Sequence, residues 1–371
     1  MTPVDAAFAT TGTEDLAASA LFAPVRLGDL ALNNRIVMAP MTRGRAGPGD
    51  VPGDLVALHY AQRASAGLIV TEGVQPSAEG KGYWRTPGIW NEAQQAAWSR
   101  VADAVHAAGG RIVMQLMHCG RVVVPANRGY AADVVAPSAL ACPDPVPGPD
   151  GTPQPCAMPR ALAVDELPRI VAEFADAARR ARAAGIDGVE LHAASGYLIN
   201  QFLNPASNRR DDDHGGSPER RARFPLEVLG AMADVVGPGR VGVRISPGNP
   251  YNGMTVDDPE ANFAPFLHGV EQLGLAYVHV VDMSLPEFDV LTWLRRHGRR
   301  PIIANNNLDR SSGAAAIASG RADAVSFGRA FIANPDLPAR LAAGAPLARP
   351  DRRGFYVGED RGYTDYPVMQ P

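Results

Sequence analysis

The sequence predicts an α/β fold of the (β/α)8 type, the TIM barrel, and three observations point to it. Eight apolar runs of strand length recur along the 371 residues. Segments with a helical spacing of apolar residues, each ending near a glycine, separate these runs. Polar side chains follow nearly every run at its carboxyl end. Eight strands that alternate with about as many helices are typical of a barrel rather than of a doubly wound sheet.

The predicted strands are continuous apolar runs, as expected for parallel strands that are covered on both faces. They cover residues 35–40, 68–74, 111–118, 188–193, 240–247, 277–282, 301–306 and 324–329. Between them, apolar side chains at a spacing near 3.6 residues predict helices. The clearest of these precede Gly109, Gly185 and Gly274, because glycine commonly ends a helix.

A barrel of this kind needs about 250 residues, so the chain has room for an insertion. Residues 119–165, after the third strand, contain nine prolines and form a long loop insertion. Prolines restrict the unfolded chain, so we expect this insertion to be an ordered cap over the catalytic face. Residues 1–20 are expected to be a disordered tail, and residues 21–371 a single domain.

Composition excludes several classes of protein. The net charge is −4 and no basic block is present, so nucleic acid is not an expected partner. Cys119, Cys142 and Cys156 form no C-x-x-C pair, which argues against disulfide frameworks and thiolate metal sites, and no metal is expected. No signal peptide and no apolar stretch of about 20 residues are found. We therefore expect a cytoplasmic protein without membrane contact, either a monomer or a homodimer.

Lys81 is the only lysine of the chain. Schiff-base aldolases and pyridoxal-phosphate enzymes need a lysine amine, usually one in a desolvated position. Lys81 lies in a loop between glycines (EGKGYW) and not at the end of a buried strand. Neither class of enzyme is therefore expected.

The segment from Gly188 to Phe202, GVELHAASGYLINQF, is the most informative part of the chain. An apolar run ends at His192, and Tyr197 follows where the chain must turn before a helical pattern begins. The carboxyl end of a barrel strand is where such folds keep their chemistry. A histidine and a tyrosine in this position could also be structural.

Further polar residues follow the other predicted strands. Each could by itself be a buried amide or half of a structural ion pair. Together they are costly to bury unless a ligand occupies that end of the barrel. They are Thr42, Glu72, Gln115, His192, Arg244, Asn306, Asn307 and Arg329, with Gly73 and Gly328 beside them.

The last two strand ends predict a phosphate site. In barrels, phosphate commonly binds to the loops after strands seven and eight. Asn306, Asn307 and Gly328 tolerate left-handed backbone, so their N–H groups can approach a phosphate closely. Arg329 supplies a planar guanidinium for its oxygens. A phosphate-bearing cofactor is the expected ligand.

Seven strings along residues 21–367 resemble the old yellow enzyme family of FMN-dependent ene-reductases. They are RIVMAPMTR, EG…GKGY…PGI, VMQLMHCGR, VELHAASGYLINQFLNPASN, GVRISP, SFGRAFIANPDL and GFY…GYTDYP. Their length and order make the resemblance specific over nearly the whole chain. The bacterial branch with N-ethylmaleimide and xenobiotic reductases is the most similar.

The resemblance implies FMN as the cofactor. Thr42, Gln115 and Arg244 would contact the polar edge of the flavin ring, and Arg244 would favour its anionic reduced form. Backbone groups would contact the edge of the flavin, and the last two strand ends would hold the phosphate. The complete set is Pro40, Met41, Thr42, Gly73, Gln115, Arg244, Asn306, Asn307, Gly328 and Arg329.

The resemblance also implies the reaction. Hydride from the flavin, itself reduced by NADPH or NADH, would reach the β-carbon of an electron-poor alkene. His192 would bind the substrate oxygen on which charge develops, and Tyr197 would protonate the α-carbon. A phenol with a pKa near 10 is protonated at neutral pH and suits this role. Tyr83 and Tyr356 would line the mouth of the pocket.

Some positions depart from the family pattern. Ser195 stands where relatives usually carry His or Asn as a second donor to the substrate oxygen, and a serine is shorter than either. One lost neutral hydrogen bond costs about 0.5–1.5 kcal/mol, or roughly 2- to 12-fold in rate. Met117 replaces a commoner tryptophan beside the substrate, so the pocket should be more open there. Asn306 replaces a commoner glycine near the phosphate.

Two other interpretations remain open. A metal-dependent barrel hydrolase would use His118, His192 and His279, but the sequence lacks an H-x-H pair in the first strand and a supporting acidic cluster. A catalytically weak flavin-binding protein would explain Ser195 and Met117 as changes in a lost active site.

Overall fold

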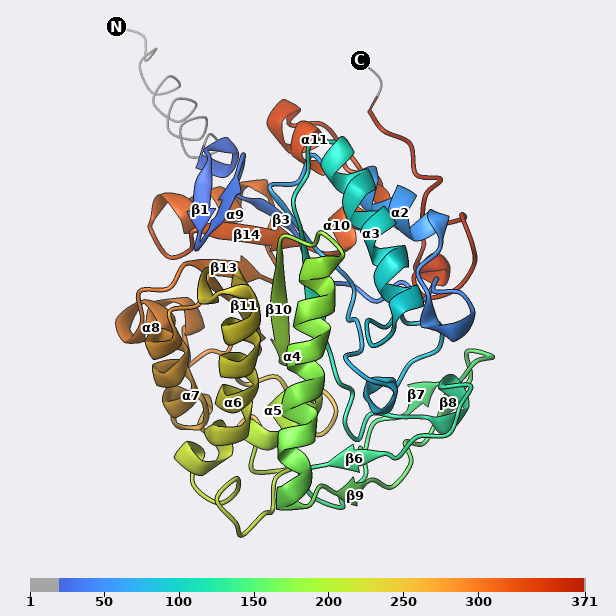
Figure 1. The fold of residues 1–371 in the computed structure, drawn as a ribbon. Coiled ribbons are helices and arrows are strands. Elements are labelled where there is room, and N and C mark those ends of the chain that lie inside the picture. The colour runs from blue at the N-terminus through green and yellow to red at the C-terminus, as the bar shows by residue number, and fades with distance from the viewer. Residues whose placement is uncertain (1–19, 370–371) are drawn as a thin grey trace, which may run out of the picture.

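The computed structural model describes residues 20–369, and its centre is a closed barrel of eight parallel strands that follow one another in sequence order (Figure 1). Each strand lies within one of the eight predicted runs, so the predicted (β/α)8 barrel is confirmed. The strands are β3 (Ile36–Met38), β4 (Leu68–Val70), β5 (Ile112–Leu116), β10 (Gly188–Ala193), β11 (Val241–Ile245), β12 (Tyr277–Val281), β13 (Ile302–Asn305) and β14 (Ala324–Phe327).

The predicted tail over residues 1–20 lies outside the described residues, apart from Ala20. This residue begins the short 3-10 helix η1 (Ala20–Phe22). The other 3-10 helices are η2 (Pro48–Asp50), η3 (Ala78–Gly80), η4 (Pro125–Asn127), η5 (Val164–Glu166), η6 (Pro238–Arg240) and η7 (Arg352–Gly354).

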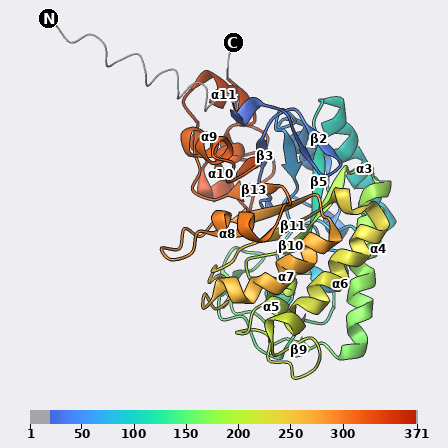
Figure 2. The same ribbon diagram turned by 90° about the vertical axis from the view of Figure 1, so that its left-hand side faces the viewer.

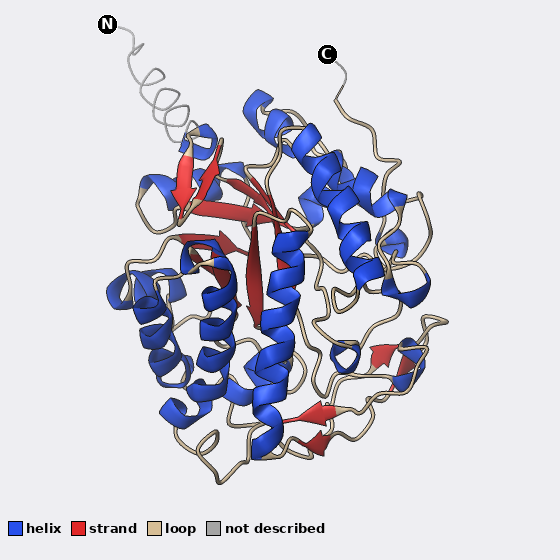
Figure 3. Cartoon of the chain, viewed as in Figure 1, coloured by secondary structure: helices blue, strands red, loops and turns tan. Residues whose placement is uncertain are grey.

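Helices surround the strands (Figure 3). They are α2 (Asp54–Ala61), α3 (Glu92–Ala107), α4 (Leu167–Ala183), α5 (Leu198–Leu203), α6 (Pro218–Val236), α7 (Pro259–Leu273), α8 (Val290–His297), α9 (Arg310–Ala318), α10 (Arg329–Ala333) and α11 (Leu337–Ala343). The helices α4, α6 and α7 pack side by side along one flank (Figure 2). Within the described part of the chain, no helix is both long and apolar enough to cross a membrane.

Helix α4 illustrates why these segments are helical. Its buried residues include Ile170, Phe174 and Ala178, which lie four residues apart and so share one face against the barrel. The opposite face carries arginines and acidic residues that reach solvent. Gly185 follows with a φ of +84°, a left-handed conformation that ends the helix.

The amino-terminal end of the barrel is closed by a hairpin of β1 (Val25–Leu27) and β2 (Leu30–Leu32). Leu27 and Leu32 are buried in a cluster with Leu68 and Tyr277 at the starts of barrel strands. Gly28 makes the turn with a φ of +59°, and a Cβ there would lie 2.4 Å from a backbone oxygen. This end is therefore filled with apolar side chains, which leaves the opposite end for a ligand.

Residues between β5 and α4 form two small sheets instead of a long helix. β6 (Val135–Ala136) pairs with β9 (Arg160–Ala161), and β7 (Val146–Pro147) pairs with β8 (Pro153–Gln154). Figure 1 shows these strands at the opposite end of the molecule from the β1–β2 hairpin. The insertion thus lies toward the carboxyl ends of the barrel strands.

Lys81 follows η3 and is only 3 % exposed, which its position between glycines did not predict. Its ammonium group forms an ion pair with Asp50 and donates to the carbonyl of Arg128 (3.1 Å). The other oxygen of the Asp50 carboxylate accepts from the hydroxyl of Tyr130 (3.0 Å). Lys81 therefore connects the loop after β4 to the insertion, and its amine is not free to act as a nucleophile.

Candidate active site

The carboxyl ends of the eight strands meet at one end of the barrel because all of the strands are parallel. The register places the polar residues of neighbouring strands side by side. Glu190 on β10 pairs with Gln115 on β5, and His192 pairs with Arg244 on β11. Arg244 is in turn opposite His279 on β12. Residues predicted at separate strand ends therefore form one site.

A hydrogen-bonded network of buried side chains crosses this end of the barrel. Nε2 of Gln115 donates to Oε1 of Glu190 (2.8 Å), and Oε2 of Glu190 lies 2.9 Å from Nδ1 of His279. Arg244 donates to Nε2 of His279 (2.7 Å) and to Oδ1 of Asn305 (2.8 Å). The side chains of Glu190 and His279 are fully buried. The network thus fixes the Arg244 guanidinium, which is 8 % exposed, toward the open end.

The charges of this network follow from burial and proximity. Burial lowers the pKa of His279 to about 4, so its imidazole is neutral at pH 7. Burial also lowers the pKa of Arg244 to about 10, which leaves its guanidinium protonated. Burial alone would raise the pKa of Glu190, but His279 and Arg244 outweigh it and hold this pKa below its usual value. The network therefore contains a buried anion and a buried cation with a neutral imidazole between them.

The two predicted catalytic side chains lie close together, His192 near the end of β10 and Tyr197 in the turn that follows it. The rings of His192 and Tyr197 meet edge to face, with centroids 4.8 Å apart. Nδ1 of His192 accepts a hydrogen bond from the N–H of Ala194 (3.2 Å), and burial lowers the pKa of His192 to about 3. The ring is therefore neutral and carries its single proton on Nε2. His192 thus presents an N–H donor on the side away from Ala194.

Tyr83 lies beside Tyr197, and their hydroxyl oxygens are 2.9 Å apart. Burial raises the pKa of Tyr197 and of Tyr83 above the usual range, so both phenols are protonated at neutral pH. Both rings pack against a buried cluster that includes Met117 and Cys119. Two predicted substrate contacts, Tyr83 and Met117, are therefore brought together with the predicted proton donor, Tyr197.

Ser195, between the two predicted catalytic residues, has a left-handed backbone with a φ of +55°. Such a conformation costs about 1–3 kcal/mol for a residue other than glycine. Two side chains hold it: Oγ of Ser246 accepts from the N–H of Ser195 (2.9 Å), and Nδ2 of Asn252 donates to its carbonyl (2.7 Å). The hydroxyl of Ser195 makes no hydrogen bond within residues 20–369. It is free to contact a ligand.

The predicted phosphate site has left-handed backbone and an unpaired cation. Asn306 and Asn307 have φ values of +90° and +52°, which asparagine tolerates. The side chain of Asn306 donates to the carbonyl of Asp282 (2.9 Å). Arg329 follows Gly328 at the start of α10 and is exposed, and its guanidinium pairs with no other described residue. These features at the ends of β13 and β14 fit a phosphate group.

The segments after β3 and β4 hold the remaining cofactor candidates. Pro40, Met41 and Thr42 are half-buried, and the hydroxyl of Thr42 has no hydrogen-bond partner in the described chain. Gly73 is buried, and a Cβ there would come 2.5 Å from the methyl group of Met117. A larger residue at this position would therefore displace the thioether of Met117.

Tyr356 lies on the C-terminal segment, which Arg43 and Arg45 hold against the loop after β3. Arg43 donates to the carbonyl of Phe355 (3.0 Å), and Arg45 donates to those of Phe355 (2.9 Å) and Val357 (2.6 Å). Tyr356 itself is 61 % exposed and makes no hydrogen bond to a described residue. The predicted role of Tyr356 at the pocket mouth stays a prediction.

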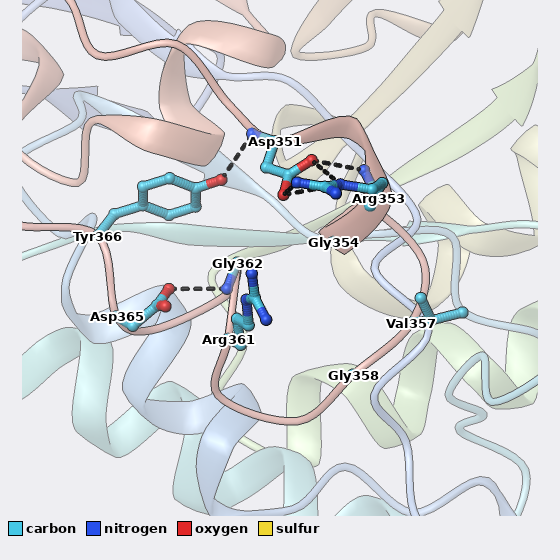
Figure 4. Close-up of a pocket in the computed structure, with 9 residues that line it drawn as sticks. All are labelled: Asp351, Arg353, Gly354, Val357, Gly358, Arg361, Gly362, Asp365 and Tyr366. Carbon is cyan, nitrogen blue, oxygen red and sulfur yellow. Dashed lines mark hydrogen bonds and ion pairs between the residues drawn. The ribbon is translucent and has the colours of Figure 1, made fainter.

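The C-terminal segment also encloses a hollow of about 380 Å³, between Asp351 and Tyr366 (Figure 4). The Asp351 carboxylate pairs with Arg353, and the Asp351 N–H donates to the Tyr366 hydroxyl (3.1 Å). Apart from Arg353 and Arg361, its lining carries no cationic side chain, and it contains no residue predicted for the site. We therefore keep the strand ends, and not this hollow, as the candidate active site.

Acid should destabilise the fold through its buried histidines. Burial lowers the pKa of His118 and His192 to about 3 and of His279 to about 4, and lowers that of His59 as well. Unfolded histidines take up protons below about pH 6.5, whereas these folded ones do not until the pH is far lower. The free energy of unfolding should therefore fall as the pH drops from 7 to 5, by up to about 1.4 kcal/mol per pH unit for each histidine.

Urea denaturation at several pH values measures this effect. In a His118→Gln variant, one fewer proton is taken up on unfolding, because one buried histidine is missing. The slope of the unfolding free energy against pH should therefore be smaller by up to about 1.4 kcal/mol per pH unit. A stability that stays constant between pH 7 and pH 5 would contradict the prediction.

Sequence reasoning missed part of the network, namely Glu190, Asn305, Ser326 and the role of His279. Oγ of Ser326 lies 2.8 Å from Nε2 of His279, so His279 contacts Ser326 in addition to Glu190 and Arg244. The sequence did contain a signal for such residues. Side chains two positions apart in a strand share a face, so a polar residue two positions from a predicted site residue is expected to face the same site. Glu190, two residues before His192, follows this rule.

The hydrolase interpretation finds no support in the structure. Among residues 20–369, no group of three or more His, Cys, Asp or Glu side chains is placed to hold a metal ion. His118 accepts at Nδ1 from the N–H of Gly120 (3.0 Å), and His279 is bound by Glu190 and Ser326. His118 and His279 thus have protein partners of their own, and the three histidines of that interpretation form no metal-binding group among the described residues.

Two known proteins are similar to this chain over nearly its whole length. A chanoclavine-I aldehyde reductase of Penicillium roqueforti is 43 % identical and covers 93 % of this chain and 95 % of its own length. A "probable flavin mononucleotide-dependent alkene reductase" of Leishmania infantum is 40 % identical, over 93 % of this chain and 96 % of its own.

Two solved structures are also similar to this chain over nearly its whole length. Morphinone reductase in complex with tetrahydroNAD is 46 % identical, with a TM-score of 0.90 over 94 % of this chain and 98 % of its own. An old yellow enzyme homologue from Zymomonas mobilis is 40 % identical, with a TM-score of 0.91 over 94 % of this chain and 100 % of its own.

A family model described as the NADH:flavin oxidoreductase / NADH oxidase family matches residues 20–348. The resemblance to old yellow enzyme, stated on seven sequence strings, is thereby confirmed. The chain belongs to the NADH:flavin oxidoreductase / NADH oxidase family.

Proposed function

We propose that this protein is an FMN-dependent oxidoreductase that uses NADPH or NADH to reduce the activated C=C bonds of enones, maleimides and nitroalkenes. The arrangement at the carboxyl ends of the strands carries this proposal. A neutral imidazole donor (His192) lies on β10, a protonated phenol (Tyr197) lies in the turn after it, and a buried cation (Arg244) lies on the neighbouring strand β11. Names of relatives support it, since one specifies flavin mononucleotide and a solved structure contains an NAD analogue.

The residues at this end fit FMN. The cofactor, when bound, supplies the hydride that goes to the alkene. Arg244, fixed by Glu190 and His279, would place a positive charge beside the ring and favour its anionic form. Thr42 and Gln115 would bind other polar atoms of the ring, with the backbone of Pro40, Met41 and Gly73 at its edge. The phosphate would be held by Asn306, Asn307, Gly328 and Arg329.

On the substrate side, Nε2–H of His192 would donate to the oxygen on which negative charge develops. Tyr197 would give its phenolic proton to the α-carbon of the alkene. Tyr83, 2.9 Å away, would then donate to the phenolate oxygen that remains on Tyr197. This hydrogen bond would stabilise the phenolate and so assist the proton transfer.

We also assign residues 119–165 the role of a cap over this site. Cys119 and Val122 belong to the buried cluster against which Tyr83 and Tyr197 pack. Arg121 donates to the carbonyl of Asn252, on the loop after β11 (2.9 Å). These contacts would exclude water from the reacting groups.

Purified protein tests the proposal directly. It should show flavin absorbance, and denaturation should release FMN. Anaerobic addition of NADPH or NADH should bleach the flavin, and N-ethylmaleimide should restore its colour. Absence of flavin would contradict the proposal.

A catalytically weak flavin-binding protein is the second candidate, and Ser195 favours it because a serine is shorter than the His or Asn that is usual at this position. The reoxidation step separates the two. If N-ethylmaleimide restores the flavin no faster than buffer does, only the binding function stands.

Replacement of Ser195 by asparagine should increase the turnover of 2-cyclohexenone about 2- to 12-fold, because a carboxamide adds one neutral hydrogen bond to the substrate oxygen. The backbone should accept the change, since asparagine tolerates a φ of +55° better than serine does. N-ethylmaleimide, which is strongly electron-poor, should respond less. Ser195→Ala is the matched control and should leave cyclohexenone turnover low. An unchanged rate in Ser195→Asn would contradict the role assigned to this position.

A further inference from the structure

Glu190 contacts two side chains that we assign to the cofactor, Gln115 and Arg244, although its own side chain is fully buried. Gln115 lies opposite Glu190 on β5 and donates from Nε2 to Oε1 of its carboxylate (2.8 Å). The other carboxylate oxygen lies 2.9 Å from Nδ1 of His279, whose Nε2 accepts from Arg244 (2.7 Å). One carboxylate therefore reaches Gln115 directly and Arg244 through a single imidazole.

The hydrogen bonds determine the charge of each group in this chain of contacts. A guanidinium can only donate, so Nε2 of His279 accepts from Arg244, and the single proton of a neutral ring is then on Nδ1. That proton faces Glu190, which accepts it, as an ionised carboxylate does. Burial lowers the pKa of His279 to about 4, in agreement with a neutral ring at pH 7. Glu190 therefore carries a negative charge that Arg244 meets through a neutral imidazole.

Glu190 is the counter-charge of Arg244 within residues 20–369. Arg244 forms no direct ion pair with a carboxylate there, and its second side-chain partner is the neutral Oδ1 of Asn305 (2.8 Å). A buried cation without a counter-charge would favour an anionic ligand strongly, whereas a cation balanced by a carboxylate favours it less. The charge of Glu190 therefore decides how much this end of the barrel prefers an anion to a neutral ligand.

We propose that Glu190 is a positioning residue, and that its buried carboxylate sets the reduction potential of bound FMN by balancing the charge of Arg244. The inference rests on the proposed function, because it concerns FMN at that site. Its negative charge weakens the preference of the site for reduced, anionic FMN over oxidised FMN, which keeps the potential low and favours transfer of hydride to the alkene. Glu190 also holds Gln115 in one orientation, since an ionised carboxylate can accept only from the NH2 group of this amide.

Glu190→Gln removes the charge and keeps the shape of the side chain. The variant should prefer reduced to oxidised FMN about 10-fold more than wild type does, which is the effect of one nearby charge in a partly polar interior. For a two-electron couple this change corresponds to a shift of about +30 mV in the midpoint potential. Equilibration of the FMN-loaded protein with a reference dye measures the potential without any turnover. Glu190→Asp keeps the charge and should return the preference to within about 2-fold of wild type.

Asn305→Asp makes the opposite change of charge and tests the proposal independently of how Glu190→Gln folds. The new carboxylate would replace a carboxamide that already accepts from Arg244, on a half-buried residue at the end of β13. The added negative charge should favour oxidised FMN about 10-fold, a shift of about −30 mV. An unchanged potential in either variant, or a shift of the same sign in both, would overturn the proposal.

The two half-reactions distinguish a change of potential from a site that is merely loosened. A higher potential in Glu190→Gln should speed reduction of the flavin by NADPH or NADH and slow its reoxidation by N-ethylmaleimide. Displacement of Arg244 alone would slow both half-reactions, and that result would also overturn the proposal. Absence of FMN from the wild-type protein would contradict the proposed function, whereas bound FMN with an unmoved potential in Glu190→Gln would contradict only the role of Glu190.

Discussion

Replacement of Tyr197 by phenylalanine is expected to slow protonation of the alkene by about 10²- to 10⁴-fold, the range typical of a positioned acid. The phenol is protonated at neutral pH because burial raises its pKa, and Tyr83 is the one proton donor within residues 20–369 that is hydrogen-bonded to it. Anaerobic stopped-flow reoxidation of the reduced flavin by 2-cyclohexenone measures this step. Reduction by NADPH should change only a few-fold, because it needs no proton from Tyr197.

Tyr83→Phe is the matched control for this prediction. It leaves the proton of Tyr197 in place and removes only one hydrogen bond to it, which should cost about 2- to 12-fold. A greater loss in Tyr83→Phe than in Tyr197→Phe would show that Tyr83 is the proton donor and would contradict our assignment.

Replacement of Lys81 by methionine should lower the free energy of unfolding by about 3–5 kcal/mol. The variant leaves the carboxylate of Asp50, which is 4 % exposed, without its cation. Tyr130 still donates to this carboxylate, but a neutral phenol does not balance its charge. Urea denaturation of wild type and variant at pH 7 measures the difference.

The double variant Lys81→Met/Asp50→Asn is the control, because it removes both charges. Asparagine tolerates the φ of +58° at position 50 and can still accept from Tyr130. Most of the lost stability should return. If the double variant is as unstable as the single one, packing around Lys81 and not the unpaired charge is the cause.

Local patterns predicted most of the fold. Continuous apolar runs matched all eight barrel strands, because parallel strands covered on both faces must be apolar at nearly every position. Glycines marked helix ends, as at Gly185 and Gly274, because few other residues adopt a positive φ at low cost. The small sheets of the insertion were not predicted, since each strand has only two residues and no periodicity can be recognised in so short a segment.

Only part of the candidate site could be predicted from the sequence. Residues that end a strand, such as His192 and Arg244, were recognised because their position alone directs them to the ligand-binding end. Glu190 and Asn305 were not, because each lies inside an apolar run and resembles an interruption of it. Asn252 lies on a loop, and only its contact with Ser195 reveals a role.

The sequence by itself determined the barrel, the family and the identity of the polar residues at the strand ends. These depend on periodicity and on motifs that are local in the chain. The tertiary structure alone decided the protonation of these residues and their partners. His192 is a neutral donor at Nε2 because the N–H of Ala194 occupies Nδ1 and burial disfavours its charge. Lys81 is an ionic link because folding brings it to Asp50, 31 residues away. Burial and pairing arise only when distant segments meet, so no local pattern contains them.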